Sequence, residues 1–339
     1  MDAVPDVAPI AEVTRGGHVE SIHFGAVAVV NAQGDLLYHA GDPYFLTFTR
    51  STLKPFQALP FLRDGGLAHF GFGSRELALM CASHSGEEMH TSIVQGMLAK
   101  AGCDEHHLRC GSHVPSHYAV AGKQPPPDAA FNQLHNNCSG KHAGFLAYCV
   151  QHGLQLDSYI DPLHPLQQAI RREVSLIAGL AETDLKRGID GCSAPNYAMP
   201  LARLAYAYAR LAQGGKDSYY GSMTGELFGA MTAHPELVSG TGRFDLAFMQ
   251  AAPGDWVAKG GAEGVQAIGI RSTGLGIALK VADGNARALY PAALSVMRQL
   301  GLLPSIGGTP LAAWVEPHIT NLRSVRTGEV RAIINLVKA

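Results

Sequence analysis

Strand-like segments stand towards both ends of the chain, and helix-like segments fill its middle. "SIHFGAVAVVN" (Ser21–Asn31) is rich in small and β-branched residues, "LLYHAG" (Leu36–Gly41) follows a turn signal, and "YFLTFTR" (Tyr44–Arg50) is a third strand candidate. Near the other end, "GVQAIGIRSTGLGIALKVADG" (Gly264–Gly284) is typical of a hairpin, and a final strand is expected near residues 325–337.

The middle of the chain has the apolar spacing of helices. Helices are predicted after a capping Ser74 and over Thr91–Gly102, Ser139–Gly153, His164–Leu180 and Pro200–Gly215, with a further one near Ala286–Leu300. This order predicts an α/β (α+β) fold with one antiparallel sheet from both chain ends and a helical insertion between them. We expect a single compact unit over 1–339, in which 1–60 and 250–339 carry the sheet and 61–249 is mainly helical.

Composition excludes several classes of protein. The 339 residues are 47% apolar and 16% charged, so a large core is expected and disorder is not. The net charge is −2 and the longest basic run is Arg171–Arg172, which gives no reason to expect nucleic acid or an anionic membrane as a partner. Because neither a signal peptide nor an apolar run of roughly 20 residues is visible, we expect a cytoplasmic protein with reduced cysteines.

The stretch "RSTLKP" (Arg50–Pro55) is the first candidate for chemistry. Ser51 and Lys54 stand three residues apart, so on the first turn of a helix their side chains share a face. A serine hydroxyl is a poor nucleophile until a base takes its proton, and a lysine can be that base if burial or a nearby cation lowers its pKa. The pattern also arises by chance, so alone it is only a hypothesis.

Two further stretches could complete a serine hydrolase site. "KGGAEG" (Lys259–Gly264) offers a lysine beside small residues, and serine hydrolases of the penicillin-binding class pair Ser-x-x-Lys with such a Lys-x-Gly on an edge strand. "CASHSGEEMH" (Cys81–His90) offers Ser83, which could relay a proton or position a substrate. Each also has a plain interpretation, as a turn and as an exposed helix end.

"HNNCSGKHAG" (His135–Gly144) and "GIDGCSAPN" (Gly188–Asn196) carry candidate metal ligands. Two thiolates, from Cys138 and Cys192, would suit zinc. Lys141 is an unusual ligand because its amine must first lose a proton, although the metal drives that loss. The alternative is a core cysteine beside a surface lysine.

Six blocks together resemble one family over nearly the whole chain, from about Glu12 to Val337. They are "VTRGGHVESIHFGAVAVV", "RSTLKPFQALP", "ASHSGE", "NNCSGKHAGFLA", "IDGCSAPNYAMPL" and "KGGAEGVQAIGI", in the order seen in the rhizobial-type (class 3) L-asparaginases, the asparaginase II family. The resemblance implies a fold like that of the serine β-lactamases and glutaminases, and a homodimer.

The same resemblance implies roles for single residues. It implies that Ser51 is the nucleophile, Lys54 its base and Ser83 a second active-site serine. It also implies a zinc site at Cys138, Lys141 and Cys192, in the helical part, with water as fourth ligand. Further residues are expected at the substrate, namely Arg50, His142, Asp190 and Lys259.

We therefore expect hydrolysis of the side-chain amide of L-asparagine through an ester on Ser51. In our hypothesis Arg50 holds the substrate carboxylate, Asp190 holds its ammonium group, and zinc organises the pocket. The alternatives are an amidohydrolase for L-glutamine or another small amide, and a non-catalytic zinc protein that senses amino acids. A penicillin-recognising enzyme is disfavoured because no Ser-Asp-Asn element stands between the two lysine motifs.

Overall fold

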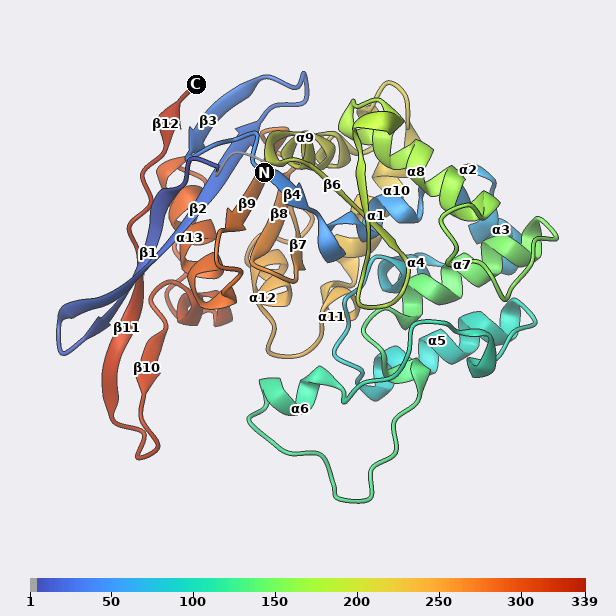
Figure 1. Cartoon of the computed structure of the whole chain (residues 1–339), viewed down its shortest axis with the longest axis horizontal. Helices are drawn as coiled ribbons and strands as arrows, with labels where there is room; N and C mark the ends of the chain where they lie inside the picture. The colour runs from blue at the N-terminus through green and yellow to red at the C-terminus, as the bar shows by residue number, and fades with distance from the viewer. Residues whose placement is uncertain (1–4) are drawn as a thin grey trace.

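The computed structural model describes residues 5–339 and contains one large antiparallel sheet built from both chain ends. Its strands run in the order β10–β11–β1–β2–β9–β8–β7, and β3 pairs with β2 and with β12 (Figure 1). The bounds are β1 Ala8–Arg15, β2 His18–Val30, β3 Leu36–Ala40, β7 Trp256–Gly261, β8 Val265–Ile270, β9 Leu275–Val281, β10 His318–Thr320, β11 Arg326–Ala332 and β12 Val337–Lys338.

A second, three-stranded sheet joins the helical part to the large sheet. It has the order β4–β6–β5, with β4 at Leu46–Phe48, β5 at Lys186–Ile189 and β6 at Pro195–Pro200. All its pairs are antiparallel. The hairpin of β5 and β6 therefore brings a segment from the middle of the chain against the strand that precedes Ser51.

Apart from β5 and β6, the regular elements between β4 and β7 are helices. Their bounds are α1 Lys54–Gln57, α2 Leu59–Arg63, α3 Gly66–Phe70, α4 Ser74–Met80, α5 Glu88–Lys100, α6 Ser116–Val120, α7 Ser139–Gln151, α8 Pro165–Ala178, α9 Leu201–Ala212, α10 Ser222–Ala233, α11 Pro235–Val238 and α12 Phe244–Ala251, with α13 Ala286–Gln299 after β9. No helix within residues 5–339 is both long and apolar enough to cross a membrane.

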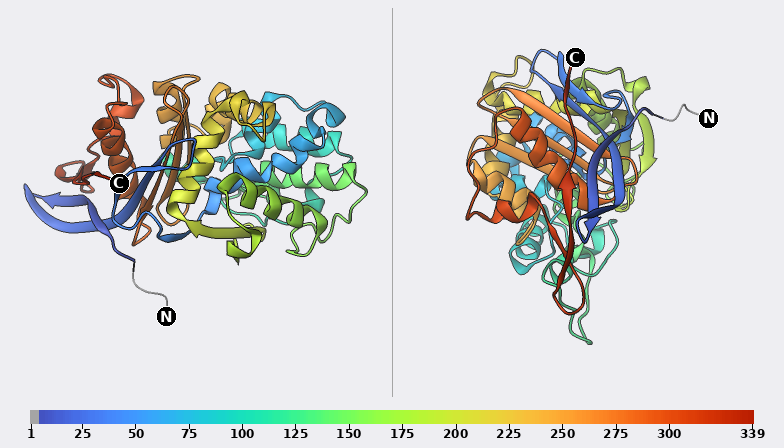
Figure 2. Two further views of the ribbon diagram at one scale, coloured as in Figure 1. Left: turned by 90° about the horizontal axis from the view of Figure 1, so that it is seen from above. Right: turned by 90° about the vertical axis from the view of Figure 1, so that its left-hand side faces the viewer.

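The large sheet lies between two helical layers (Figure 2). On one side α13 packs against β8, β9, β1 and β11, and on the other α9 packs against β2, β8 and β9. In α9 the buried residues Leu201, Leu204, Ala205 and Tyr208 have helical spacing. A Cβ on Gly276 of β9 would lie only 1.9 Å from the Ala205 carbonyl oxygen, so a glycine there permits this close packing.

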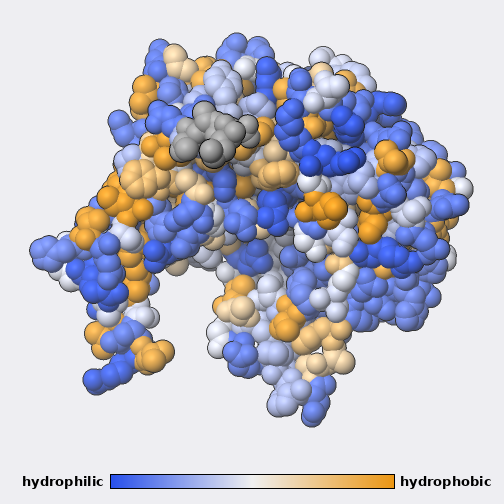
Figure 3. Space-filling view, in the orientation of Figure 1, coloured by the Kyte–Doolittle hydropathy of each residue, from blue (hydrophilic) through white to orange (hydrophobic). Residues whose placement is uncertain are grey.

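Two strand pairs extend from the body as an arm, formed by the outer ends of β1–β2 and by β10–β11 (Figure 1). The space-filling view shows an open recess between this arm and the loop that carries α6 (Figure 3). Several large apolar side chains of the arm are exposed, namely Val19, Ile22, Phe24, Leu322 and Val325.

The predicted fold class is confirmed, since both chain ends form one antiparallel sheet and helices lie between them in sequence. Several details differ. The strand expected over Tyr44–Arg50 is shorter, since β4 spans Leu46–Phe48 and Arg50 begins a 3₁₀ turn. The prediction did not include β5, β6, β10 or the helices α10–α12, and the single strand expected near residues 325–337 is two strands, β11 and β12. Ser74 is the first residue of α4 rather than its cap, because Gly73 occupies the capping position.

Candidate active site

Ser51 lies in a short 3₁₀ turn, η1 (Arg50–Leu53), between β4 and α1. Lys54 is the first residue of α1, and Pro55 follows where a helix needs no backbone N–H. The turn packs against the end of β7, where a Cβ on Gly261 would lie 3.3 Å from the Arg50 Cβ. The Ser-x-x-Lys motif therefore follows a strand and opens a helix, as the sequence predicts.

Two buried lysines converge on the hydroxyl of Ser83. Lys54 Nζ lies 2.9 Å from Ser83 Oγ, and Lys259 Nζ lies 2.8 Å from the same atom. Each lysine is only 1% exposed. The structure thus brings together three of the residues singled out in the sequence, and Ser51 lies one helical turn before Lys54.

The remaining hydrogen bonds of the two amines differ. Lys54 Nζ also donates to the carbonyl oxygens of Ala82 (2.5 Å) and Asn137 (3.3 Å), so with the serine it has three acceptors, one for each N–H of an ammonium group. Among residues 5–339, Lys259 Nζ donates only to the Gly260 carbonyl (2.8 Å) and to the serine. Lys259 therefore has fewer partners for a full positive charge.

Burial lowers the pKa of Lys259 to about 7, and the positive charge of Lys54 acts in the same direction. The carboxylate of Asp245 opposes both. Asp245 is 5% exposed and accepts hydrogen bonds from the Gly260 N–H (2.7 Å) and from Gln266 Nε2 (3.0 Å). An amine with such a pKa can accept a proton near neutral pH.

Ser83 follows the end of α4 in a segment fixed by its backbone. Its N–H donates to the Val238 carbonyl (2.9 Å), and the next N–H, of His84, donates to the Asn137 carbonyl (3.2 Å). Because the Asn137 carbonyl also accepts from Lys54, this one backbone group connects the lysine cluster with the loop that leads to Cys138.

The side chains of Cys138, Lys141 and Cys192 meet at the N-terminus of α7. Lys141 Nζ lies 3.0 Å from Cys192 Sγ. Cys138 directly precedes α7, Lys141 lies in its first turn, and Cys192 lies in the loop between β5 and β6. All three side chains are buried, and all six cysteines of the chain are free thiols.

Two glycines allow α7 to approach α4 closely. A Cβ on Gly140 would lie 2.4 Å from the Leu79 carbonyl oxygen, and one on Gly144 would lie 2.5 Å from Met80 Cε. The "SG" and "AG" that flank Lys141 in the sequence are therefore needed for packing, and this packing positions the lysine.

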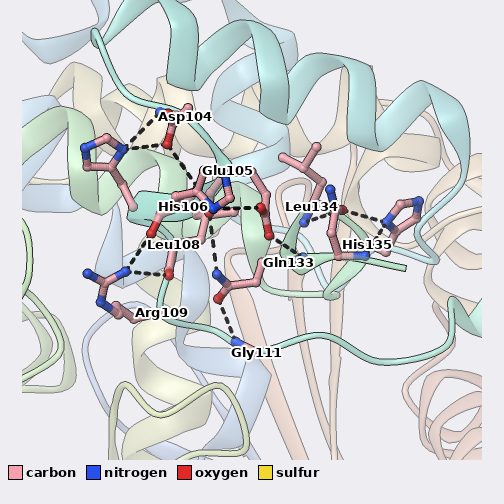
Figure 4. A network of polar contacts seen from close by, with 11 residues as sticks. Asp104, Glu105, His106, Leu108, Arg109, Gly111, Gln133, Leu134 and His135 are labelled. Carbon is pink, nitrogen blue, oxygen red and sulfur yellow. Dashed lines mark hydrogen bonds and ion pairs between the residues drawn. The ribbon is translucent and has the colours of Figure 1, made fainter. Parts of the chain in front are cut away.

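A polar network holds the loop before α7 (Figure 4). Glu105 Oε1 accepts from the Gln133 N–H (2.9 Å), and Gln133 Oε1 accepts from the Gly111 N–H (3.0 Å). Asn136 then donates to the Gly111 carbonyl (3.0 Å) and accepts from the Cys138 N–H (2.9 Å). These bonds fix the backbone from which Cys138 projects.

The three side chains form a thiolate, a thiol and an ammonium group in contact. A hydrogen bond from Cys138 lowers the pKa of Cys192 far below the usual range of a thiol, and the charge of Lys141 adds to this. The same contact, together with burial, raises the pKa of Cys138. Burial opposes the charge on Lys141, but the neighbouring thiolate outweighs it and raises the pKa of the lysine.

This donor set fits a zinc ion. Two sulfurs and one nitrogen are ligands that zinc accepts, and the metal would take the place of the protons on Cys138 and Lys141. Among residues 5–339, no group of three or more His, Cys, Asp or Glu side chains could hold a metal ion. The third protein ligand would therefore have to be Lys141.

His142, predicted at the substrate, lies in the protein interior and is fully buried. Its Nδ1 lies 2.7 Å from Tyr159 Oη, which also accepts from the Arg109 N–H (2.8 Å). Burial lowers the pKa of His142, so its ring is neutral at neutral pH. The structure places it beside the cysteines and gives it no exposed surface.

Arg50 and Asp190, the predicted partners of the substrate's two charged groups, bind each other. Arg50 Nε donates to Asp190 Oδ1 (2.9 Å), and Glu263 lies 3.9 Å from the same guanidinium group. A cavity of about 440 Å³ opens beside Arg50 and Glu263. It is lined by Leu46, Thr47, Phe48, Arg50, Gly188, Ile189, Asn196, Glu263 and Lys280.

A larger cavity, of about 610 Å³, is lined by residues such as Gly214, Arg271 and Gly274. It lies at the opposite end of β8 from the turn that carries Glu263, whereas the smaller cavity includes Arg50, the residue before Ser51, in its lining.

The family model described as L-asparaginase II matches residues 11–332, nearly the whole chain. The chain belongs to the L-asparaginase II family. This agrees with the resemblance of the six sequence blocks. A search of curated proteins finds no match to the chain.

Solved structures give more distant similarities to this L-asparaginase II family member. The native form of a protein called Mglu is 15% identical with a TM-score of 0.47, and the match covers 83% of this chain and 65% of that one. A putative β-lactamase from Bacteroides dorei is 11% identical with a TM-score of 0.42, and covers 81% of this chain and 93% of its own. Neither likeness bears on the substrate. The match to the native form of Mglu covers less than two thirds of that protein's length.

Sequence reasoning missed two buried residues of the site, Asn196 and Asp245. Asn196 stands at the end of a quoted motif, but an asparagine beside a proline indicates only a turn. Asp245 stands in the first turn of α12, where an acidic residue is common for reasons of helix stability. Their partners Arg50 and Gly260 are distant in sequence, so no local pattern identifies them.

Proposed function

We propose that the chain hydrolyses the side-chain amide of L-asparagine to L-aspartate and ammonia, with Ser51 as nucleophile and Lys54 as its base. One observation carries this proposal. Lys54 and Lys259 both bind the Ser83 hydroxyl, at 2.9 and 2.8 Å, and Lys54 stands one helical turn after Ser51 in the chain. The family supports amide hydrolysis as the reaction class.

The two lysines suggest a path for the proton. Ser51 Oγ attacks the amide carbon as its proton moves to Lys54 in its neutral form, and the proton then leaves on the departing ammonia. Ser83 Oγ lies within hydrogen-bonding distance of both amines, so a proton on Lys54 can pass through this hydroxyl to Lys259 when Lys259, whose pKa is about 7, is neutral. Water then cleaves the ester on Ser51 and releases L-aspartate.

The substrate's charged groups fit the ion pair beside the cavity. In our proposal the Arg50 guanidinium binds the substrate carboxylate and Asp190 binds the ammonium group. When the substrate binds, Arg50 exchanges the Asp190 carboxylate for the substrate carboxylate, and Asp190 exchanges the Arg50 guanidinium for the substrate ammonium group. Lys259 acts at the proton path, and His142 supports the cysteines instead of touching the substrate.

We propose that Cys138, Lys141 and Cys192 hold zinc. Bound there, the metal would supply a fixed positive charge and hold two loops together. The serine and lysines need no metal-bound nucleophile, so we assign the metal an organising part. A homodimer and a cytoplasmic location stay predictions.

Ammonia release from L-asparagine and L-glutamine, measured side by side with the purified chain, tests the substrate. We expect release from asparagine at a much higher kcat/KM. Faster release from glutamine would favour the alternative amidohydrolase. Binding of asparagine without any release would favour the amino-acid sensor.

A further inference from the structure

Arg50, the residue before the proposed nucleophile, has a left-handed backbone with a φ of 49°. This conformation is disfavoured for a residue with a side chain, because its Cβ crowds the backbone. Such a backbone persists only when its surroundings hold it, and it gathers at functional sites. The question is which contacts hold Arg50.

Asn196 holds both backbone polar groups of Arg50. Its Oδ1 accepts from the Arg50 N–H (3.1 Å), and its Nδ2 donates to the Arg50 carbonyl oxygen (3.0 Å). The Asn196 side chain is buried, with 3% exposure. Of the common side chains, a primary amide offers a donor and an acceptor in this spacing, whereas a carboxylate offers acceptors alone.

The surroundings of this contact are rigid on the side of the small sheet. Thr49 donates from its N–H (3.0 Å) and its Oγ1 (2.9 Å) to the Tyr197 carbonyl, which follows Asn196 in β6. Thr52 Oγ1 in turn donates to the Thr49 carbonyl (2.6 Å). The strand that carries Asn196 is therefore fixed to Thr49, the residue before Arg50, and Thr49 is fixed to the turn after Arg50, so the amide can act as a clamp.

We propose that Asn196 is a positioning residue for Ser51: its amide keeps Arg50 in the left-handed conformation that directs the next residue, Ser51, towards the reacting carbonyl. The inference rests on the proposed function, because it takes Ser51 as the nucleophile. Without the clamp Arg50 relaxes to an ordinary backbone conformation, and Ser51 Oγ leaves the line of attack.

Asn196→Ala tests the clamp, with Asn196→Asp as a second variant that keeps an acceptor for the Arg50 N–H. Thr224→Val is the matched control. Thr224 is fully buried, and its hydroxyl lies 2.6 Å from the Gly214 carbonyl and 3.1 Å from the Gly221 carbonyl, which share its one donated proton, away from the site. Both exchanges therefore remove a buried side chain's hydrogen bonding to the backbone from the folded chain.

Three quantities are measured on each folded variant. They are kcat at saturating L-asparagine, Tm, and the rate at which a diazoketone analogue of asparagine alkylates Ser51, read by mass spectrometry of the peptide. We expect Asn196→Ala to lower kcat and the alkylation rate by roughly 10- to 100-fold, with Asn196→Asp in between. Thr224→Val should lower Tm similarly and leave both rates unchanged.

The inference is overturned if Asn196→Ala alkylates Ser51 as fast as the control does, or if a crystal structure of the variant retains the left-handed Arg50. Failure of the proposed function gives a different result. In that case the unmodified chain itself neither releases ammonia from asparagine nor becomes alkylated at Ser51.

Discussion

Lys259 is a buried amine whose protonation decides whether the proposed proton path is open. Burial lowers its pKa to about 7, and the charged or titratable groups that act on it are Lys54, Asp245, Arg243 and Cys138. Because the neutral amine is the one that accepts a proton, the active fraction grows as the pH rises past this value.

We therefore predict that kcat rises with pH through a midpoint of about 7. In Asp245→Asn the midpoint should move to lower pH, because the Asp245 carboxylate raises the pKa of Lys259 and its removal lets that pKa fall further. A pH profile of kcat for asparagine checks both statements. Asp255→Asn, the same charge change just before β7, is the control and should leave the midpoint in place.

An unchanged midpoint in Asp245→Asn would contradict the assignment of Lys259 to the proton path. So would a kcat that falls as the pH rises through neutrality.

At the residue scale, the sequence predicted the residues that carry unusual chemistry and missed those that hold them. Ser51, Lys54, Ser83 and Lys259 stand in recognisable motifs, and three of them share hydrogen bonds in the structure. Asn196 acts through a contact 146 positions away in the chain, and no local pattern reports such a distance.

The hairpin of β5 and β6 connects the proposed metal site to the nucleophile. Within it, Asp190 binds the Arg50 side chain, Asn196 binds the Arg50 backbone, and Cys192 lies between them in sequence. A metal ion on Cys192 would fix the middle of the hairpin to α7. Its influence on Ser51 would then pass through the hairpin instead of through the reacting atoms.

Removal of metal by a chelator should consequently loosen this hairpin. We predict faster amide hydrogen exchange over residues 186–200 and a fall in kcat of roughly 100-fold, as expected for an angstrom-scale displacement of the nucleophile. Exchange over the β8–β9 hairpin, residues 265–281, is the internal control and should not change. Metal analysis of the purified chain establishes the starting state.

Equal exchange and equal kcat before and after chelation would contradict an organising role for the metal. A purified, active chain that contains no zinc would contradict the site itself.

At the element scale, sequence patterns identified long periodic elements and failed for short ones. The helix α7 was expected over Ser139–Gly153 and spans Ser139–Gln151. The strands β5 and β6, "KRGI" and "PNYAMP", have four and six residues, and β6 is buried almost throughout. Alternation cannot appear in such segments, because both of their faces meet protein or the strand is too short.

For the whole molecule, the arrangement follows from closing the two chain ends into one sheet. β2 pairs with β9 over Gly25–Val30, which places strands some 250 positions apart side by side. This closure brings β7, with Lys259, against the turn that carries Ser51. The order of elements predicted the closure, but the close approach of α9 to Gly276 depends on distances that a sequence does not display.

The account rests on a covalent intermediate at Ser51, and its most direct test is to trap it. The chain is mixed with L-asparagine, quenched in acid during turnover, digested and analysed by mass spectrometry. We predict an aspartyl ester on the peptide that contains Ser51, absent from Ser51→Ala, which should release no ammonia. An aspartyl ester on Ser83, or full turnover by Ser51→Ala, would contradict the account.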